Sequence, residues 1–253
     1  MSEIDDSNLR LARRIVEAAC GLLVISGAGM SAECGIQTFR RPGDDGAWDQ
    51  AAQQLATPEG FQREPQHVWS WYRRRRLQAL AAQPHAGYTA LASWEQRAPV
   101  FVVTQNVDGL HARAGSSRVV ELHGSLHRFK CAAQSHAITD GCDQDVVPRC
   151  SICGSYVRPA VVWFGEYVPD AAISGAAEAL EAAQAVLLVG TSLVVNTPGG
   201  LLRSAARRGL PIIEVNPDPA LPRPADAQVS GHLPPATTVL AGPAGVVLPR
   251  LLA

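Results

Sequence analysis

The sequence predicts an α/β protein with a doubly wound parallel sheet and a smaller lobe made of two insertions. Short apolar runs of strand length alternate with helical segments along the 253-residue chain, which is the order expected of a parallel sheet. A glycine-rich turn directly follows the first run, as in Rossmann-like folds. Two segments break this alternation, one helical and one rich in cysteine, and we expect them to form the smaller lobe.

Composition narrows the class of protein. Hydrophobic residues make up 47% of the chain, charged residues 18%, and the net charge is −1, as in a globular protein without a nucleic-acid-binding surface. The acidic start lacks a signal segment and no apolar run reaches membrane-spanning length. We therefore expect a cytoplasmic protein without a membrane partner. Its oligomeric state is open, with a monomer favoured.

The elements of the larger lobe follow in order. An opening helix is expected over residues 9–20 because its apolar residues fall on one stripe. One of three polar residues caps it, Asp5, Asp6 or Ser7. Four apolar runs predict strands buried on both faces, over residues 22–25, 100–103, 185–189 and 211–215. Helices are expected between them, over residues 87–94, 171–184 and 198–208.

The helical insertion, residues 41–84, contains one well-defined helix over residues 68–77. Four successive arginines lie in this helix and cannot share one face. We expect Arg73, Arg74 and Arg76 to be solvated.

A phosphate-binding turn is predicted after the first strand, where residues 27–32 read G-x-G-x-x-A. Gly27 permits a tight turn, Gly29 lets the backbone approach a pyrophosphate, and the small Ala32 lets the next helix pack closely. The amides at the helix start would face the anion. A dinucleotide-binding dehydrogenase has an acidic residue about 20 positions later, after a second strand. Here a loop with an aromatic residue and two arginines follows instead.

Polar residues also gather after two later apolar runs. Residues 104–111, TQNVDGLH, follow the second predicted strand, where open α/β sheets place their ligands. Residues 121–125, ELHGS, follow a short Val119–Val120 run. Together with residues 27–40, GAGMSAECGIQTFR, these motifs resemble the signatures of the sirtuins, the NAD-dependent protein lysine deacylases. The resemblance extends over residues 18–252.

The resemblance implies NAD as co-substrate and acylated-lysine proteins as partners. His123 would be the catalytic base, Asn106 and Asp108 would hold the nicotinamide and its ribose, and Gln105 would contact the ribose. The remaining cofactor positions implied are Gly27, Ala28, Gly29, Ser31, Ala32, Thr38, Phe39, Arg40, Gly190, Thr191, Ser192, Asn216 and Ala244. The products would be free lysine, nicotinamide and O-acyl-ADP-ribose.

The peptide substrate would pair with the strand-like segment that begins at Val161. In the family this segment binds the acyl-lysine peptide through its backbone, which is a β-augmentation. The substrate-binding positions implied are Val162, Trp163, Phe164, Gly165 and Glu166.

Three positions indicate which acyl group the protein would remove. Tyr72 and Arg75, three apart in a predicted helix, share a face and match the Tyr-x-x-Arg pair of sirtuins that act on malonyl- and succinyl-lysine. Thr38 stands where most deacetylases of the family have Asp. Ala56 stands where they have a bulky residue, and so leaves room for a longer chain. Arg75 would bind the terminal carboxylate, assisted by the Tyr72 hydroxyl.

The cysteine-rich insertion resembles the sirtuin zinc ribbon. Six cysteines in a cytoplasmic chain indicate metal or thiol chemistry rather than disulfides. One C-x-x-C pair is present, Cys150 and Cys153, but Cys131 is followed at that spacing by Gln134. We expect a structural zinc ion on Cys131, Cys150, Cys153 and, as the favoured fourth ligand, Cys142, with His136 as the alternative ligand. A metal-free lobe is the other alternative.

We expect one catalytic domain over residues 1–253. Its larger lobe would comprise residues 1–40, 85–125 and 165–253, and its smaller lobe residues 41–84 and 126–164. The alternatives to a desuccinylase or demalonylase of bacterial type are a general deacetylase, a mono-ADP-ribosyltransferase on the same scaffold, and a non-enzymatic NAD sensor. An intact His123 argues against the sensor, since binding alone needs no base.

Overall fold

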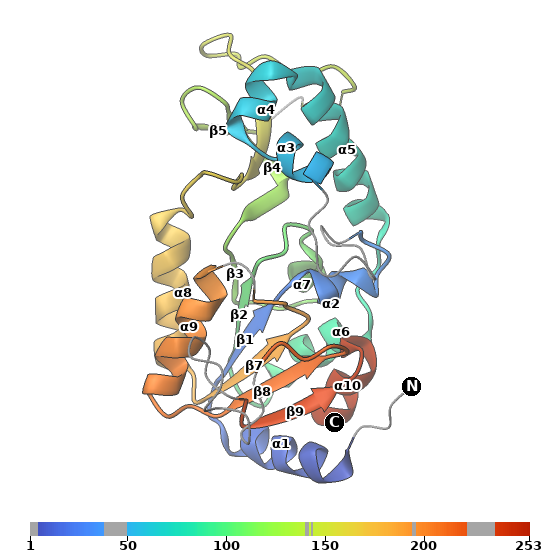
Figure 1. Ribbon diagram of the computed structural model, residues 1–253, viewed down its shortest axis with the longest axis vertical. Helices are drawn as coiled ribbons and strands as arrows, with labels where there is room; N and C mark the ends of the chain where they lie inside the picture. Colours follow the sequence, from blue (N-terminus) through green and yellow to red (C-terminus); the bar gives the residue numbers. More distant parts are fainter. Residues whose placement is uncertain (1–4, 38–49, 140–141, 143, 194–195, 222–235) are drawn as a thin grey trace.

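A six-stranded parallel sheet, in the order β3-β2-β1-β7-β8-β9, organises the computed structural model of the chain (Figure 1). The strands are β1 (Leu22–Ser26), β2 (Val100–Thr104), β3 (Val119–Glu121), β7 (Ala185–Val189), β8 (Ile212–Asn216) and β9 (Thr238–Ala241). The four strands predicted from apolar runs are confirmed. The edge strand β9 was not predicted, because only four residues form it.

The structure describes residues 5–37, 50–139, 142, 144–193, 196–221 and 236–253. Thr38, Phe39 and Arg40, which are implied cofactor positions, lie outside the described residues. Within the described part of the chain, no helix has both the length and the apolar character needed to cross a membrane.

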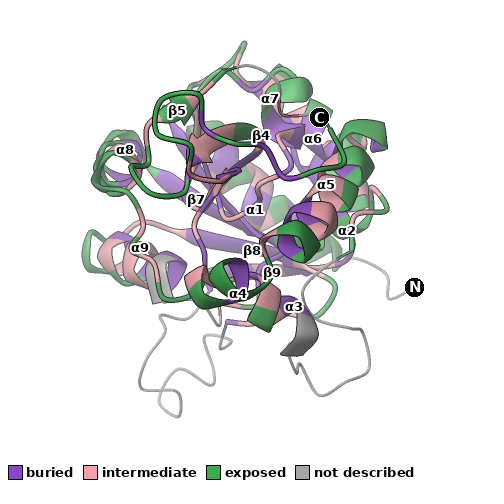
Figure 2. Cartoon of the chain, turned by 90° about the horizontal axis from the view of Figure 1, so that it is seen from above, coloured by how far each residue is buried: buried purple, intermediate pink, exposed green. Residues whose placement is uncertain are grey.

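Helices cover both faces of the sheet. One face packs against α1 (Asp6–Ala18), α6 (Ala86–Trp94) and α10 (Ala244–Leu251), and the other against α8 (Asp170–Ala182) and α9 (Asn196–Arg207). Each face has its own buried cluster of aliphatic side chains, since alternate residues of a strand point to opposite faces. Figure 2 shows the strands buried between helices whose outer sides are exposed. The doubly wound sheet is therefore confirmed.

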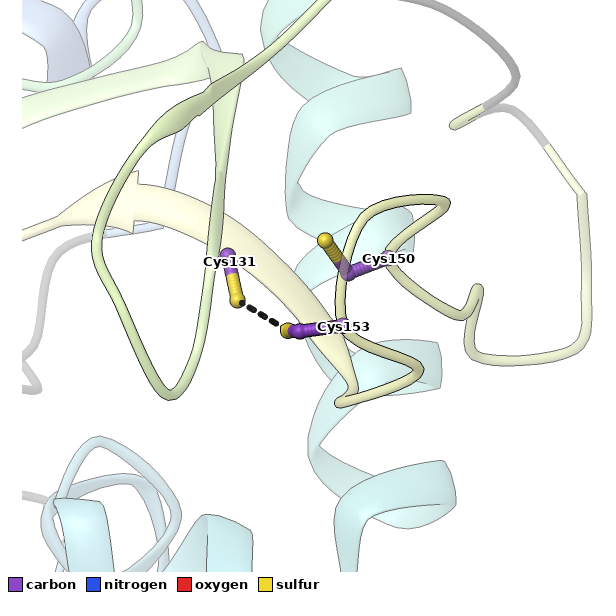
Figure 3. Close-up of side chains that lie close together, drawn as sticks. All are labelled: Cys131, Cys150 and Cys153. Carbon is purple, nitrogen blue, oxygen red and sulfur yellow. Dashed lines mark hydrogen bonds between the residues drawn. The ribbon is translucent and has the colours of Figure 1, made fainter.

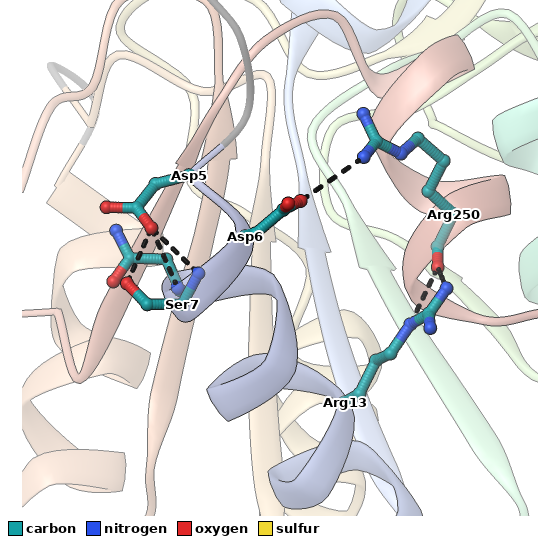
Figure 4. Close-up of polar contacts among 6 residues, drawn as sticks. Asp5, Asp6, Ser7, Arg13 and Arg250 are labelled. Atoms are coloured by element: carbon teal, nitrogen blue, oxygen red, sulfur yellow. Dashed lines mark hydrogen bonds and ion pairs between the residues drawn. The ribbon is translucent and has the colours of Figure 1, made fainter.

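Hydrogen bonds at its N-terminus and contacts with the last helix hold α1 in place. Asp5 is its N-cap and accepts a hydrogen bond from the Ser7 N–H at 2.8 Å. Arg13 Nε donates to the Arg250 carbonyl at 3.0 Å, and the Arg250 guanidinium lies 3.8 Å from Asp6 (Figure 4). These contacts join α1 to α10.

A second, antiparallel sheet has the order β5-β4-β6, from β4 (Gly124–Cys131), β5 (Ala137–Ile138) and β6 (Val157–Val161). The helical insertion packs on it through α3 (Gln50–Leu55), α4 (Pro58–Arg63) and α5 (Pro65–Ala81). Trp69, Tyr72, Leu126 and Trp163 belong to the cluster that both insertions share. The predicted smaller lobe is therefore present, at the top of Figure 1.

Helix α5 is longer than the predicted 68–77, because Pro65 starts it at a position where no N–H is needed. Two of the arginines predicted to be solvated are only partly exposed. Arg76 lies 5.4 Å from the centroid of the Phe129 ring, and Arg73 pairs with Asp145 at 2.8 Å. Arg74 is exposed, as predicted.

Candidate active site

The turns after β1 and β7 pack directly against each other. Gly29 N–H donates to the Gly190 carbonyl at 2.8 Å. A Cβ on Gly29 would lie 2.8 Å from that oxygen, and one on Gly190, whose φ is +58°, would lie 2.3 Å from the Met30 nitrogen. Gly29 and Gly190 are therefore needed for this contact between turns, whereas the sequence motif predicts that Gly29 lies against a pyrophosphate.

Two further expectations for this turn are corrected. Ala32 is exposed, so its small size does not serve helix packing. The N–H groups of Gly29 and Met30 at the start of α2 (Ala28–Ala32) are bonded to the carbonyls of Gly190 and Gly27. These two amides are therefore not available to an anion in this structure. Ala28 and Gly29 are exposed on the outer side of the turn.

A buried hydrogen-bond network connects the ends of β1 and β2. Asn106 Nδ2 donates to the Gly27 carbonyl at 2.9 Å and to Ser31 Oγ at 2.8 Å. Ser31 Oγ donates to Asp108 Oδ2 at 2.6 Å. Because the Ser31 hydroxyl has only one proton, the Tyr88 hydroxyl, 3.0 Å away, must donate to it. The network holds the Asn106 and Asp108 side chains in fixed orientations.

His123 lies beside this network, directly after β3. Its Nδ1 is 3.1 Å from the Gln105 carbonyl oxygen. A carbonyl only accepts, so Nδ1 carries the proton and Nε2 keeps its lone pair. Burial lowers the pKa of His123, against a smaller opposing effect of the bond to Gln105. The imidazole is therefore neutral at pH 7 and able to take up a proton at Nε2.

The other implied cofactor positions lie at the same edge of the sheet. Gln105 Nε2 donates to Thr191 Oγ1 at 2.9 Å, and Asn216 Nδ2 donates to the Thr191 carbonyl at 3.1 Å. Ser192 is exposed next to them. The ends of β1, β2, β7 and β8 thus carry a continuous set of amides and hydroxyls. This donor set fits a nucleotide with several hydroxyl groups.

Ala244 is in a different situation. Its N–H donates to Glu33 Oε1 at 2.6 Å, and the Gly245 N–H donates to Glu33 Oε2 at 3.0 Å. The carboxylate of Glu33 thus binds the positive end of α10. In this structure Glu33, which the sequence argument did not single out, holds the amide expected to contact the cofactor.

The expected substrate strand has different bounds. Strand β6 ends at Val161, and the following residues turn at Phe164 and Gly165, where Gly165 has a φ of +86°. The Val162 N–H donates to the His123 carbonyl at 2.9 Å, and the Phe164 N–H donates to the Ala56 carbonyl at 2.9 Å. The segment is therefore a turn bonded to its own chain, not a continuous strand.

A buried arginine that the sequence argument missed fixes this turn. Arg158 of β6 makes two hydrogen bonds to the Glu166 carboxylate, at 2.6 and 2.8 Å, and its Cζ lies 3.2 Å from the centroid of a Trp163 ring. Burial raises the pKa of Glu166, but the bonds from Arg158 and the Trp163 N–H lower it below the ordinary value. Glu166 is therefore occupied within the turn. In the sequence, Arg158 could have been noticed as the single charged residue of an otherwise apolar strand.

The predicted acyl-binding residues lie together in the smaller lobe. Tyr72 is buried and stacks on Trp163 with ring centroids 6.3 Å apart. Ala56 belongs to the same cluster. Arg75, half-buried on α5, lies 5.0 Å from the centroid of the Trp71 ring. Burial lowers the pKa of Arg75, opposed by Tyr72 and Asp108, and burial raises the pKa of Tyr72.

Three of the predicted metal ligands are also brought together. The sulfurs of Cys131, Cys150 and Cys153 lie within 4.8 Å of one another (Figure 3), and none of the three is in a disulfide. Three thiol groups at this spacing match the soft donor set that zinc prefers. Among the described residues, neither Cys142 nor His136, the two candidates for a fourth ligand, is part of this group, and His136 Nε2 lies 3.1 Å from Cys150 Sγ.

Several known proteins are similar to this chain in sequence and in fold. A family model described as Sir2 family matches residues 27–197. The NAD-dependent protein deacylase 1 of Pseudomonas aeruginosa is 43% identical over an alignment 256 residues long, which covers 95% of this chain and 97% of that protein. The NAD-dependent protein deacylase 2 of Pyrobaculum aerophilum is 43% identical over 233 residues, or 91% and 89%. A crystal structure of a Sir2 homolog–NAD complex has a TM-score of 0.83 at 35% identity, covering 99% of this chain and 93% of that one. The chain therefore belongs to the Sir2 family.

Proposed function

We propose that this protein removes acyl groups from lysine side chains of proteins, with NAD as co-substrate. Acyl-lysine, NAD and water would give lysine, nicotinamide and O-acyl-ADP-ribose. The observation that carries the proposal is the Asn106–Ser31–Asp108 network next to a neutral His123 whose Nε2 keeps its lone pair. The deacylase names of the relatives and the NAD complex of a structural neighbour support it.

Each residue has a part in this reaction. When bound, NAD would supply an anomeric carbon that the acyl oxygen can attack, with nicotinamide as leaving group. Asn106 and Asp108, oriented by their hydrogen bonds, hold the nicotinamide and its ribose. Gln105 contacts the ribose. His123 Nε2 accepts the proton of a ribose hydroxyl, and Nδ1–H, bonded to the Gln105 carbonyl, keeps the ring in place.

The two lobes have different roles in the proposed reaction. We assign residues 1–40, 85–125 and 165–253 to the larger, NAD-binding lobe, and residues 41–84 and 126–164 to the smaller one. The turn after Val161 leaves Phe164 partly exposed and bonded to Ala56, which belongs to the same cluster as Tyr72. An extended peptide bound at this turn would bring its acyl-lysine to the acyl-binding residues. We also assign the protein to the cytoplasm, in keeping with cysteines that form no disulfide, and we expect a monomer.

The proposal is tested with an acyl-lysine peptide and NAD, followed by mass spectrometry. The peptide is expected to lose its acyl group. His123→Ala should reduce turnover by about 10²–10⁴-fold, which is the usual worth of a general base, while NAD binding persists. The exposed His67→Ala, on α5, is the matched control and should be fully active.

Two outcomes contradict this. A peptide that gains ADP-ribose instead of losing its acyl group would identify a transferase. A His123→Ala variant that keeps more than about a tenth of the activity, far above the expected loss, would mean that another group is the base.

We further propose that succinyl and malonyl groups are preferred over acetyl. Arg75 is half-buried and lies on the same face of α5 as Tyr72, three residues away. Burial lowers the pKa of Arg75, and Tyr72 and the carboxylate of Asp108 in the catalytic network oppose this effect. The small side chain of Ala56, in the same cluster, leaves space for a longer chain. A guanidinium binds a terminal carboxylate through two parallel hydrogen bonds.

Matched acetyl- and succinyl-peptides test this preference. A hydrogen bond to a charged group is worth about 1.5–3 kcal/mol, so Arg75→Met should lower kcat/KM for the succinyl peptide by roughly 10–100-fold. Acetyl turnover should barely change, because acetyl has no carboxylate. Arg74→Met, the exposed neighbour on α5, is the control. Equal losses on both peptides would assign Arg75 to the fold and leave a general deacetylase.

A further inference from the structure

The Tyr88 side chain of α6 is completely buried beside the network of Asn106, Ser31 and Asp108, with an exposed fraction of 0%. Its ring packs against two histidines, with ring centroids 4.8 Å from His85 and 4.7 Å from His111. These contacts fix the ring on both sides. They hold the Tyr88 hydroxyl 3.0 Å from Ser31 Oγ.

The directions of the hydrogen bonds around Ser31 follow from groups that can only accept. The Gly27 carbonyl only accepts, so the atom of Asn106 that faces it is the amide nitrogen, which also lies 2.8 Å from Ser31 Oγ. Ser31 therefore accepts from Asn106 and donates its only proton to the Asp108 carboxylate, at 2.6 Å. A hydroxyl has one proton and two lone pairs. The second lone pair of Ser31 is the place that the Tyr88 hydroxyl fills, as a donor.

The Tyr88 hydroxyl keeps its proton for this bond. Burial, followed by the charge of Asp108, raises the pKa of Tyr88. The phenol is therefore neutral at pH 7, and its O–H remains a donor. A hydroxyl that accepts a hydrogen bond is polarised by it and donates a stronger bond onward. The bond from Tyr88 to Ser31 thus strengthens the bond from Ser31 to Asp108.

The orientation of Asp108 depends on this chain of bonds. Its Oδ1 accepts from the Leu110 N–H at 2.9 Å, and its Oδ2 accepts from Ser31. Asp108 and Ser31 are both buried, at 5% and 2% exposed. Loss of the Tyr88 hydroxyl would leave a buried lone pair of Ser31 without its donor, which is costly away from water. It would also weaken one of the two contacts that orient the carboxylate.

We propose that Tyr88 is a positioning residue for NAD, which acts through Ser31 to orient the Asp108 carboxylate and the Asn106 amide. Tyr88 itself would not touch the cofactor. The inference rests on the roles proposed above for Asn106 and Asp108 in holding the nicotinamide and its ribose. If Tyr88 were only a core residue, its ring would matter and its hydroxyl would not.

Tyr88→Phe tests this because it removes the hydroxyl and leaves the ring. The dissociation constant of NAD, measured by calorimetry without peptide, should rise by about 2–10-fold, the usual worth of a neutral hydrogen bond. In the deacylation assay the KM for NAD should rise similarly, whereas the KM for the acyl-lysine peptide should not change. Tyr156→Phe, at a half-buried tyrosine of the cysteine-rich insertion, is the matched control and should bind NAD like the wild type.

A double-mutant cycle with Ser31→Ala separates positioning from packing. If Tyr88 acts through Ser31, Tyr88→Phe should not weaken NAD binding further once the Ser31 hydroxyl is absent. An unchanged NAD affinity in Tyr88→Phe, or losses that multiply in the double variant, would overturn the proposal. A wild type that binds NAD but leaves the peptide acylated would contradict the proposed reaction instead, and the calorimetric comparison would still decide the role of Tyr88.

Discussion

Three histidines of the larger lobe are each set in one tautomer by their partners. The Gly87 N–H donates to His85 Nδ1, so His85 Nε2 donates to the Met30 carbonyl. Ser26 Oγ donates to Thr104, so it accepts from His111 Nε2. His123 has the opposite arrangement, with Nδ1 protonated. Its free Nε2 belongs to a half-buried ring, whereas the free nitrogen of His111 is sealed in the core.

Some residues of this network could be predicted from the sequence, and others could not. Asn106, Asp108 and His123 were predicted because each follows a strand, and parallel strands end at the same edge of the sheet. Their partner Tyr88 was not predicted. It comes from a helix and reaches Ser31 across 57 positions of the chain. No local pattern encodes such a contact.

At the level of single elements, the turn after β6 depends on one ion pair. The Arg158 side chain is only 5% exposed and that of Glu166 23%. Arg158 also donates to the Val161 carbonyl at 2.7 Å, and Glu166 accepts from the Trp163 N–H at 2.8 Å. The pair thus closes the turn onto its own strand. Sequence reasoning predicted an extended segment here, because its apolar residues resemble a strand.

Removing Arg158 should destabilise this element. Arg158→Met leaves a carboxylate without its cation, and breaking a buried pair costs about 3–5 kcal/mol. Since Glu166 is partly exposed, we expect roughly 3 kcal/mol in urea unfolding, near the lower end of that range. In the double variant with Glu166→Gln no uncompensated charge remains, so much of the loss should be recovered. Strictly additive losses in this cycle would show that the two side chains do not act as a pair.

At the level of the whole molecule, the chain joins two sheets with separate cores. The larger sheet was predictable because most of its strands are continuous apolar runs. Such runs are typical of a parallel sheet that helices cover on both faces. The three-stranded sheet was not predicted, since β4 includes polar and charged residues such as His127 and Arg128. Its pairing is set by contacts between distant segments, such as Gly124 with Val161. Tertiary packing decides such elements.

The stability of the whole molecule should depend on pH through His111. Burial, with a smaller contribution from His85, lowers the pKa of His111 to about 3. In the unfolded chain a histidine has a pKa of about 6.5. Between these values the unfolded state binds one proton more than the folded state at this site. Unfolding free energy should therefore fall as pH drops below 6.5, by about 1.4 kcal/mol per pH unit.

Urea unfolding of wild type and His111→Asn between pH 8 and pH 5 isolates this effect. At pH 8 the variant should be less stable by about 1–3 kcal/mol, because a packed side chain is lost. As the pH falls from 6.5 to 5, the wild type should lose about 2 kcal/mol more than the variant, so that the difference between them shrinks. Half-buried Glu121 and buried Glu214, whose pKa values are raised by burial, change stability in the opposite direction but are common to both proteins. The exposed His67→Asn should keep the full pH dependence of the wild type. Parallel curves for the wild type and His111→Asn would mean that His111 is protonated equally in the folded and unfolded states.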